Sequence, residues 1–188
     1  MSTSYQIQEQ DKLHYITMQV VYWIDVFTRQ RYRDILIDSL HYCQKEKGLD
    51  IFAYVIMSNH VHLIVRSSNE NLSQTVGDLK KFTSQQIIKS IETEPESRRE
   101  WMLWMFKHAA EKHKRNKNYQ FWTHENHAVL LYSEQFIKER LLYIHDNPVR
   151  AGIVEHPEDY LYSSARNYAS LESVLEIDLL SFTWKTYT

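Results

Sequence analysis

Two short apolar runs separated by a polar pair constrain the fold of this chain more than any other feature. Ile51 to Met57 is one continuous apolar run, Val61 to Val65 is the second, and Ser58-Asn59 between them is a turn signal. Together they predict a buried β-hairpin over residues 51–65. Because the chain has only three glycines and three prolines, we expect regular elements joined by short loops around this hairpin.

The remaining elements follow from periodicity and from the residues that begin or end helices. Strands are expected at 15–23, 119–122 and 128–131, where β-branched and aromatic residues gather. Helices are expected at 31–47, at 71–91, at 100–114 and from Ser133 to about Asn147. Gly48 should end the first of these helices, and Pro148 should end the last, because a proline disfavours helical geometry in the residue before it.

The end of the chain carries weaker signals. Residues 160–169 are expected to add a helical turn, and the apolar segment 174–184 to dock on the body or on a partner. The order of strands and helices predicts an α+β fold, an antiparallel sheet flanked by helices.

Length and composition favour one cytoplasmic domain. The chain has 188 residues, of which 43% are apolar, enough for a single core. No window approaches the ~18 consecutive apolar residues that a membrane helix needs. The N-terminus has neither the basic start nor the apolar stretch of a secretory signal, and the single cysteine, Cys43, has no internal disulfide partner.

Two histidines in the second hairpin strand are the strongest functional signal. His60 and His62 are two residues apart, so in a strand they point to the same side while Val61 points to the other. Two adjacent imidazoles can bind a divalent metal. The alternative is a pair of half-buried histidines bonded to neighbours. A metal site would need further ligands, for which His124, His127, His145, Asn147 and acidic residues are candidates.

A tyrosine in the last long helix is the second signal. Tyr143 and Asn147 are four residues apart and share a helix face. The phenol could reach a metal-bound phosphate, and the amide oxygen could reach the metal. The alternative is a core tyrosine, one of 13 in the chain, with Asn147 ending the helix.

A local basic stripe is the third signal. The net charge is −2, but residues 107–117 carry five basic residues against Glu111 alone. Such a stripe can bind phosphates, although it is also compatible with a solvated helix face. The basic residues are Lys107, Lys112, Lys114, Arg115 and Lys117.

These segments resemble one family when they are taken together and in order. Asn59-His60-Val61-His62 follows an apolar strand, Phe121-Trp122 comes later, and residues 143–152 are Tyr-Ile-His-Asp-Asn-Pro-Val-Arg-Ala-Gly. Pro157-Glu158-Asp159-Tyr160 and Ser163-Ser164-Ala165 complete the pattern. It resembles the REP-associated tyrosine transposases, which are single-tyrosine transposases of the HUH superfamily. The resemblance spans residues 15–168 and leaves 169–188 as an extension of a single transposase IS200-like domain.

The resemblance implies a ferredoxin-like antiparallel sheet, metal ligands at His60 and His62, a catalytic tyrosine at Tyr143 and a metal-binding polar residue at Asn147. It also implies Mg²⁺ or Mn²⁺, single-stranded DNA near hairpins as substrate, and a homodimer. The wider superfamily often has glutamine at the position of Asn147. The segment 92–118, with its extra helix, and the tail after Ala169 depart from the family pattern.

The predicted activity is that of a DNA nickase and strand transferase that forms a 5′-phosphotyrosine. Phosphate contacts are predicted at Lys80, Lys81, Arg115 and Lys117, and base stacking at Trp122. Two alternatives stay open: a domesticated protein that binds hairpin DNA without cutting it, and a small metallohydrolase with no nucleic-acid role.

Overall fold

The computed structural model describes residues 7–112, 118–124 and 126–182. Four strands and five α-helices, with three short 3₁₀ helices, make up this part of the chain. In chain order they are β1 (His14–Gln19), η1 (Val21–Trp23), η2 (Val26–Thr28), α1 (Gln30–Lys47), β2 (Leu49–Ile56), β3 (His60–Ser67), α2 (Leu72–Thr93), α3 (Arg99–Glu111), β4 (Val129–Leu130), α4 (Glu134–Arg150), η3 (Pro157–Asp159) and α5 (Ala165–Tyr168).

The four strands form one antiparallel sheet in the order β2-β3-β1-β4. β1, α1, β2, β3, α2 and β4 follow one another as in the β-α-β-β-α-β arrangement of ferredoxin-like folds, with α3 inserted before the last strand. The expected α+β class is therefore confirmed.

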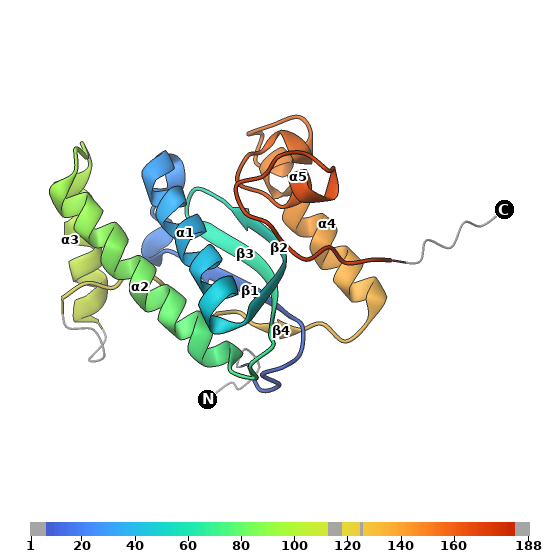
Figure 1. Cartoon of the computed structure of the whole chain (residues 1–188). Helices are drawn as coiled ribbons and strands as arrows, with labels where there is room; N and C mark the ends of the chain where they lie inside the picture. Colours follow the sequence, from blue (N-terminus) through green and yellow to red (C-terminus); the bar gives the residue numbers. More distant parts are fainter. Residues whose placement is uncertain (1–6, 113–117, 125, 183–188) are drawn as a thin grey trace.

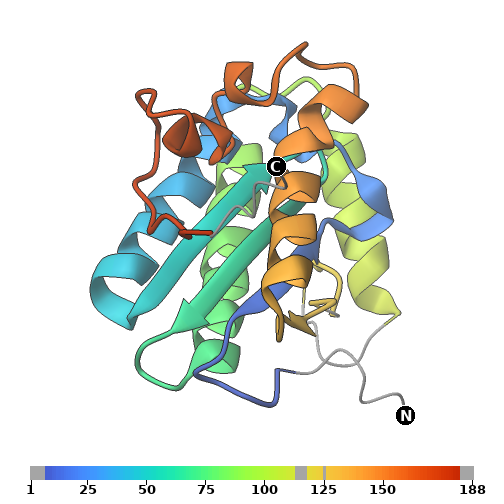
Figure 2. The ribbon, with the colours of Figure 1, turned by 90° about the vertical axis from the view of Figure 1, so that its right-hand side faces the viewer.

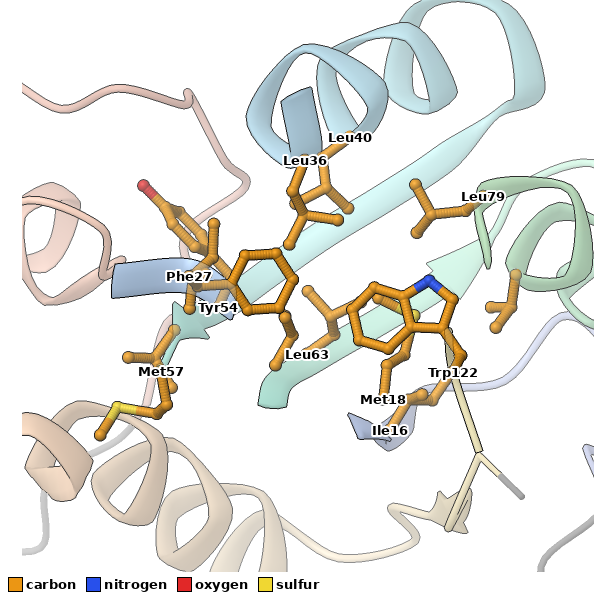
Figure 3. Close-up of a cluster of buried hydrophobic side chains, with 14 of the residues drawn as sticks. Ile16, Met18, Phe27, Leu36, Leu40, Tyr54, Met57, Leu63, Leu79 and Trp122 are labelled. Atoms are coloured by element: carbon orange, nitrogen blue, oxygen red, sulfur yellow. The ribbon is translucent and has the colours of Figure 1, made fainter. Parts of the chain in front are cut away.

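Helices cover both faces of the sheet (Figures 1 and 2). α1 and α2 lie side by side on one face, and α4 crosses the other. A core lies between the sheet and helices α1 and α2, where Leu36 of α1, Leu79 of α2 and Leu63 of β3 belong to one buried cluster (Figure 3). Alternation along β3 places Val61, Leu63 and Val65 on this side, so the intervening residues face α4.

The hairpin and the end of the first helix are confirmed. β2 and β3 pair antiparallel around residues 57–59. Gly48 follows α1 with φ 63°, in the left-handed region that glycine adopts without steric cost, and its N–H donates to the Cys43 carbonyl.

Three strand predictions need correction. β1 ends at Gln19, because the backbone then turns into η1, where Trp23 N–H donates to the Val20 carbonyl. Residues 119–122 form no strand and contribute only the bridge between Trp122 and Val20, while the strand expected at 128–131 shortens to Val129–Leu130. The aromatic and β-branched residues there serve the core rather than the sheet.

The predicted end of α4 is also wrong. The Ser133 hydroxyl caps the helix by accepting the Phe136 N–H, as expected, but the helix continues past Asn147 to Arg150 with Pro148 inside it. Pro148 lies in the last turn, so its missing N–H removes only one backbone bond, and its ring is buried.

The C-terminal segment covers the β2 edge of the sheet. Ser163 bridges Val55, and Asp178 N–H donates to the Ile51 carbonyl at 2.9 Å. Leu175 is buried in the core, so the expected docking occurs on the body itself over residues 174–182, while residues 183 and 184 lie outside the described part of the chain. It also protects strand atoms that would otherwise be free to pair with another chain.

No helix in the described ranges combines the length and the apolar character needed to cross a membrane.

Candidate functional site

His60 and His62 lie side by side on the sheet face that α4 covers. Their ring centroids are 4.7 Å apart. β3 is paired on both sides here, to Gln19 and Thr17 of β1 and, at His62, to Val55 of β2. The strand spacing thus places both imidazoles as the sequence predicts, on a backbone that the sheet holds in register.

Hydrogen bonds fix one nitrogen of each ring. Tyr15 Oη lies 2.7 Å and Thr17 Oγ1 2.9 Å from His62 Nδ1. His60 Nδ1 lies 2.8 Å from Asn59 Oδ1, to which it donates. His62 Nε2 is buried and has no hydrogen-bond partner among the described residues. A buried polar atom without a hydrogen-bond partner destabilises the fold unless a ligand supplies the partner.

Burial also keeps both imidazoles neutral. It lowers the pKa of His62 to about 3, with contributions from His60 and Arg140. Burial lowers the pKa of His60 as well. A neutral imidazole has a lone pair to offer, and ligating histidines are typically oriented by a bond to the second ring nitrogen. The pair therefore fits a divalent metal as two of its ligands.

α4 brings Tyr143 to this pair. The Tyr143 ring centroid lies 5.4 Å from that of His62 and 6.4 Å from that of Tyr15. The ring is half-buried, and within the described part of the chain its hydroxyl makes no hydrogen bond. The phenol oxygen is thus accessible beside the histidines.

Two arginines of α4 add positive charge around the tyrosine. The Arg150 guanidinium lies 5.4 Å from the centre of the Tyr143 ring, and that of Arg140 lies 5.1 Å from the centre of the Tyr15 ring. Arg140 Nε is buried and unpaired among the described residues. Such groups suit a phosphate beside Tyr143.

Neither arginine was predicted from the sequence, although their helical spacing from Tyr143 indicates them. Arg140 comes three residues before Tyr143 and Arg150 seven after it, which places all three on one face.

Asn147 follows one turn after Tyr143, as predicted, but its amide is engaged locally. Its Nδ2 donates to the Tyr143 carbonyl at 2.6 Å. The amide oxygen is the atom that remains for a ligand.

His145, one of the candidate further ligands, points elsewhere. Its Nε2 lies 2.9 Å from Ser164 Oγ and its ring packs edge-on against Tyr168, beside the C-terminal segment. His124 and His127 line a separate cavity next to Tyr22. Across residues 7–112, 118–124 and 126–182, no three His, Cys, Asp or Glu side chains converge on one point.

The predicted DNA-contact residues are not brought to the site. Trp122 is 5% exposed, donates to Thr83 Oγ1 at 3.0 Å and stacks on Phe27, so it belongs to the core and cannot stack on a base (Figure 3).

The two lysines of α2 lie across the sheet from Tyr143. Lys80 donates to the Thr123 carbonyl at 2.7 Å and to Asn126 Oδ1 at 2.6 Å, and burial lowers its pKa to about 8. It ties α2 to Thr123 and Asn126 and is not a free phosphate contact. Lys81 is exposed on α2, while Arg115 and Lys117 lie outside the described residues.

Comparison with protein families identifies one family for this chain. The family model described as "Transposase IS200 like" matches residues 9–112, which include both histidines and end before Tyr143. No curated protein matches the chain.

One solved structure shows the same fold. The chain is similar to a REP-associated tyrosine transposase bound to a REP hairpin, with a TM-score of 0.60 and 18% identity over 97% of this chain and 96% of that one. A proposed transposase from Deinococcus radiodurans R1 has 18% identity and a TM-score of 0.43, over 78% of this chain and 97% of that one.

Proposed function

This chain belongs to the transposase IS200-like family, and from that premise we propose that it is a metal-dependent nickase and strand transferase of single-stranded DNA. Tyr143 is its nucleophile, and His60 and His62 are its metal ligands. The convergence of these three rings from β3 and α4, at 4.7 and 5.4 Å, is the observation that carries the proposal.

His60 and His62 would hold Mg²⁺ or Mn²⁺ through the ring nitrogens that carry no hydrogen bond. The Asn147 amide oxygen is the further protein ligand in this proposal, and water or the DNA phosphate completes the set. When bound, the cation acts as a Lewis acid that withdraws charge from a non-bridging phosphate oxygen.

The chain's own residues supply the nucleophile and its positioning. Tyr143 loses its phenolic proton to solvent and its oxygen attacks phosphorus. The bond from phosphorus to the 3′ oxygen breaks, and that oxygen takes up a proton and leaves as a 3′-hydroxyl. Arg140 and Arg150 orient the phosphate against the phenol. The 5′-phosphotyrosine keeps the energy of the broken bond, so a second 3′-hydroxyl can reseal it without a nucleotide cofactor.

Hairpin DNA is the proposed substrate, in line with the structure of the similar transposase bound to a REP hairpin. We propose that residues 1–188 form one domain, with a body over about 15–168 and the extension 169–188. We also propose that two copies of the chain form a homodimer. A monomeric mass in solution at micromolar concentration would contradict the dimer alone.

A covalent adduct tests the proposal. The protein is incubated with Mg²⁺ or Mn²⁺ and a labelled single strand that carries the hairpin flanking its own gene, and the mixture is resolved under denaturing conditions. We expect an adduct that disappears with chelator and with Tyr143→Phe. Tyr132→Phe is the matched control, because Tyr132 is 80% exposed just before α4 and should form the adduct normally.

Other outcomes separate the alternatives. Tight hairpin binding without an adduct would contradict the nickase and favour a binder that does not cut. Hydrolysis of small phosphoesters without any binding of single-stranded DNA would favour a metallohydrolase.

A further inference from the structure

A row of aromatic rings leads away from the histidine pair along η1 and onto α3. Trp23 meets His60 edge-on, with ring centroids 5.8 Å apart. The preceding residue, Tyr22, stacks on His108 of α3 at 6.3 Å. His108 stacks in turn on Trp104 at 5.5 Å, with ring planes 2° from parallel. We call Trp23, Tyr22, His108 and Trp104 the aromatic row.

The row is exposed to solvent, although its rings are large. Trp104 is 61% exposed, Trp23 57% and Tyr22 40%. One turn earlier on α3, Trp101 continues the same helix face and is 48% exposed. Scattered exposed aromatics need no explanation, but contiguous ones mark a binding surface.

The backbone holds two of these rings outward at a cost. Tyr22 and Trp23 have φ of 55° and 56°, the left-handed region that non-glycine residues rarely adopt. Such a conformation is energetically unfavourable and persists only where its surroundings enforce it. Here Val21 on the preceding side is buried and donates to the Phe121 carbonyl at 2.9 Å. The exposure of the two rings is therefore built into the fold.

Positive charge accompanies the rings. Lys112 Nζ lies 5.2 Å from the centre of the Tyr22 ring, and Lys107 is exposed on α3 beside His108. A cavity of about 410 Å³ opens next to Tyr22 and is also lined by Lys112, His124 and His127. Flat rings interleaved with cations match a ligand made of flat rings on an anionic backbone.

We propose that the aromatic row is a stacking track for unpaired nucleotides of single-stranded DNA, continuous with the site at His60 and Tyr143. This inference rests on the proposed function and adds the path of the strand. Duplex DNA does not fit the track, because its base faces are covered by stacking, whereas unpaired bases can lie on aromatic side chains whatever their sequence. α3, the extra helix expected from the sequence within residues 92–118, gains a role as half of this track.

Equilibrium binding with two probes tests the track. The first is a fluorescent oligothymidylate of about 12 nucleotides, and the second is an abasic strand of the same length and charge. We expect the wild-type protein to bind the first about tenfold or more tightly than the second. Trp104→Ala and Tyr22→Ala should each lower oligothymidylate affinity by about 5- to 100-fold and leave abasic affinity nearly unchanged.

Tyr42→Ala is the matched control. Tyr42 is 56% exposed on α1, a helix on the opposite face of the sheet from α4, and its removal should leave both affinities as in the wild type. Thermal melting of each variant confirms that it is folded.

Three outcomes would overturn the track. If the Trp104→Ala and Tyr22→Ala proteins keep the wild-type preference for oligothymidylate, the track is refuted. In that case, formation of the Tyr143 adduct would still support the proposed function. If these variants have the mass of a monomer in solution but unchanged DNA affinity, the aromatic row is instead a contact between two copies of the chain. A wild-type protein that binds neither probe and forms no adduct would remove both proposals.

Discussion

The orientation of His62 depends on two hydroxyl groups rather than on the strand alone. Burial raises the pKa of Tyr15 to about 12, so its phenol stays neutral. Tyr15 Oη and Thr17 Oγ1 both lie within hydrogen-bond distance of His62 Nδ1, and in the tautomer that binds metal they accept the Nδ1–H. Nε2 is thereby left for a ligand. Groups that hold a ligating histidine in this way contribute strongly to metal affinity.

Removing the Tyr15 hydroxyl should weaken metal binding. We expect Tyr15→Phe to lower Mn²⁺ affinity by up to about tenfold, and the double change with Thr17→Val by about 10- to 100-fold. Titration calorimetry measures both. Tyr42→Phe serves as control, and an unchanged affinity in the double variant would show that these hydroxyls do not position a metal ligand.

At the residue scale, local spacing predicted more of the site than residue type did. The two-residue period of a strand was enough to place His60 beside His62, and the resemblance led to Tyr143. Trp122 and Lys80 were wrongly predicted to contact DNA, because burial is decided by packing between distant segments. Trp122 packs against Phe27 and donates to Thr83, and Lys80 donates hydrogen bonds to Thr123 and Asn126. Whether an aromatic ring or a lysine faces solvent is not encoded in its near neighbours.

At the scale of elements, the junction of α1 and β2 depends on one glycine. Gly48 ends the helix with φ 63°, and a Cβ there would meet the Asn69 side chain at 2.6 Å. The sequence predicted this boundary, since a glycine after a helical run is a local signal. The sequence predicted the wrong end for α4 at Pro148, because the free-energy cost of a proline in the last turn depends on the surroundings of its ring.

Two glycine substitutions should therefore have opposite signs. Gly48→Ala should lower the free energy of unfolding by about 1 kcal/mol or more, because alanine is strained at positive φ and crowds Asn69. Gly77→Ala, in the middle of α2 with nothing within 4 Å of the added carbon, should raise it by about 0.5–1 kcal/mol. Urea denaturation compares them, and equal effects would refute the assigned role of Gly48.

At the scale of the whole molecule, a buried carboxylate ties the α2–α3 connection to the start of α1. Glu96 has no exposed side-chain surface and accepts hydrogen bonds from Arg29 Nε at 2.7 Å and Tyr32 Oη at 3.0 Å. Burial alone would raise the pKa of Glu96, but bonds from the Arg98 backbone and from Arg29, Arg98 and Tyr32 side chains outweigh it and lower the pKa to about 2. No local pattern in the sequence predicts this long-range contact.

The pH dependence of stability should show this carboxylate. A pKa below the ordinary 4.5 means that the folded state favours the ionised form, so its contribution is complete above about pH 4.5 and is lost as pH falls towards 2. We expect about 3 kcal/mol of unfolding free energy to disappear in that window. Denaturation at a series of pH values measures it. Glu96→Gln should flatten this part of the profile, and an unchanged slope would contradict the assignment.

The central claim is that this fold brings one particular tyrosine to DNA beside the histidine pair, and mass spectrometry of the purified protein–DNA adduct tests it most directly. After digestion of protein and DNA, the account predicts a nucleotide 5′-phosphate on the peptide that contains Tyr143. A nucleotide on Tyr15 instead, whose ring lies only 6.4 Å from that of Tyr143, or on any other residue, would contradict it.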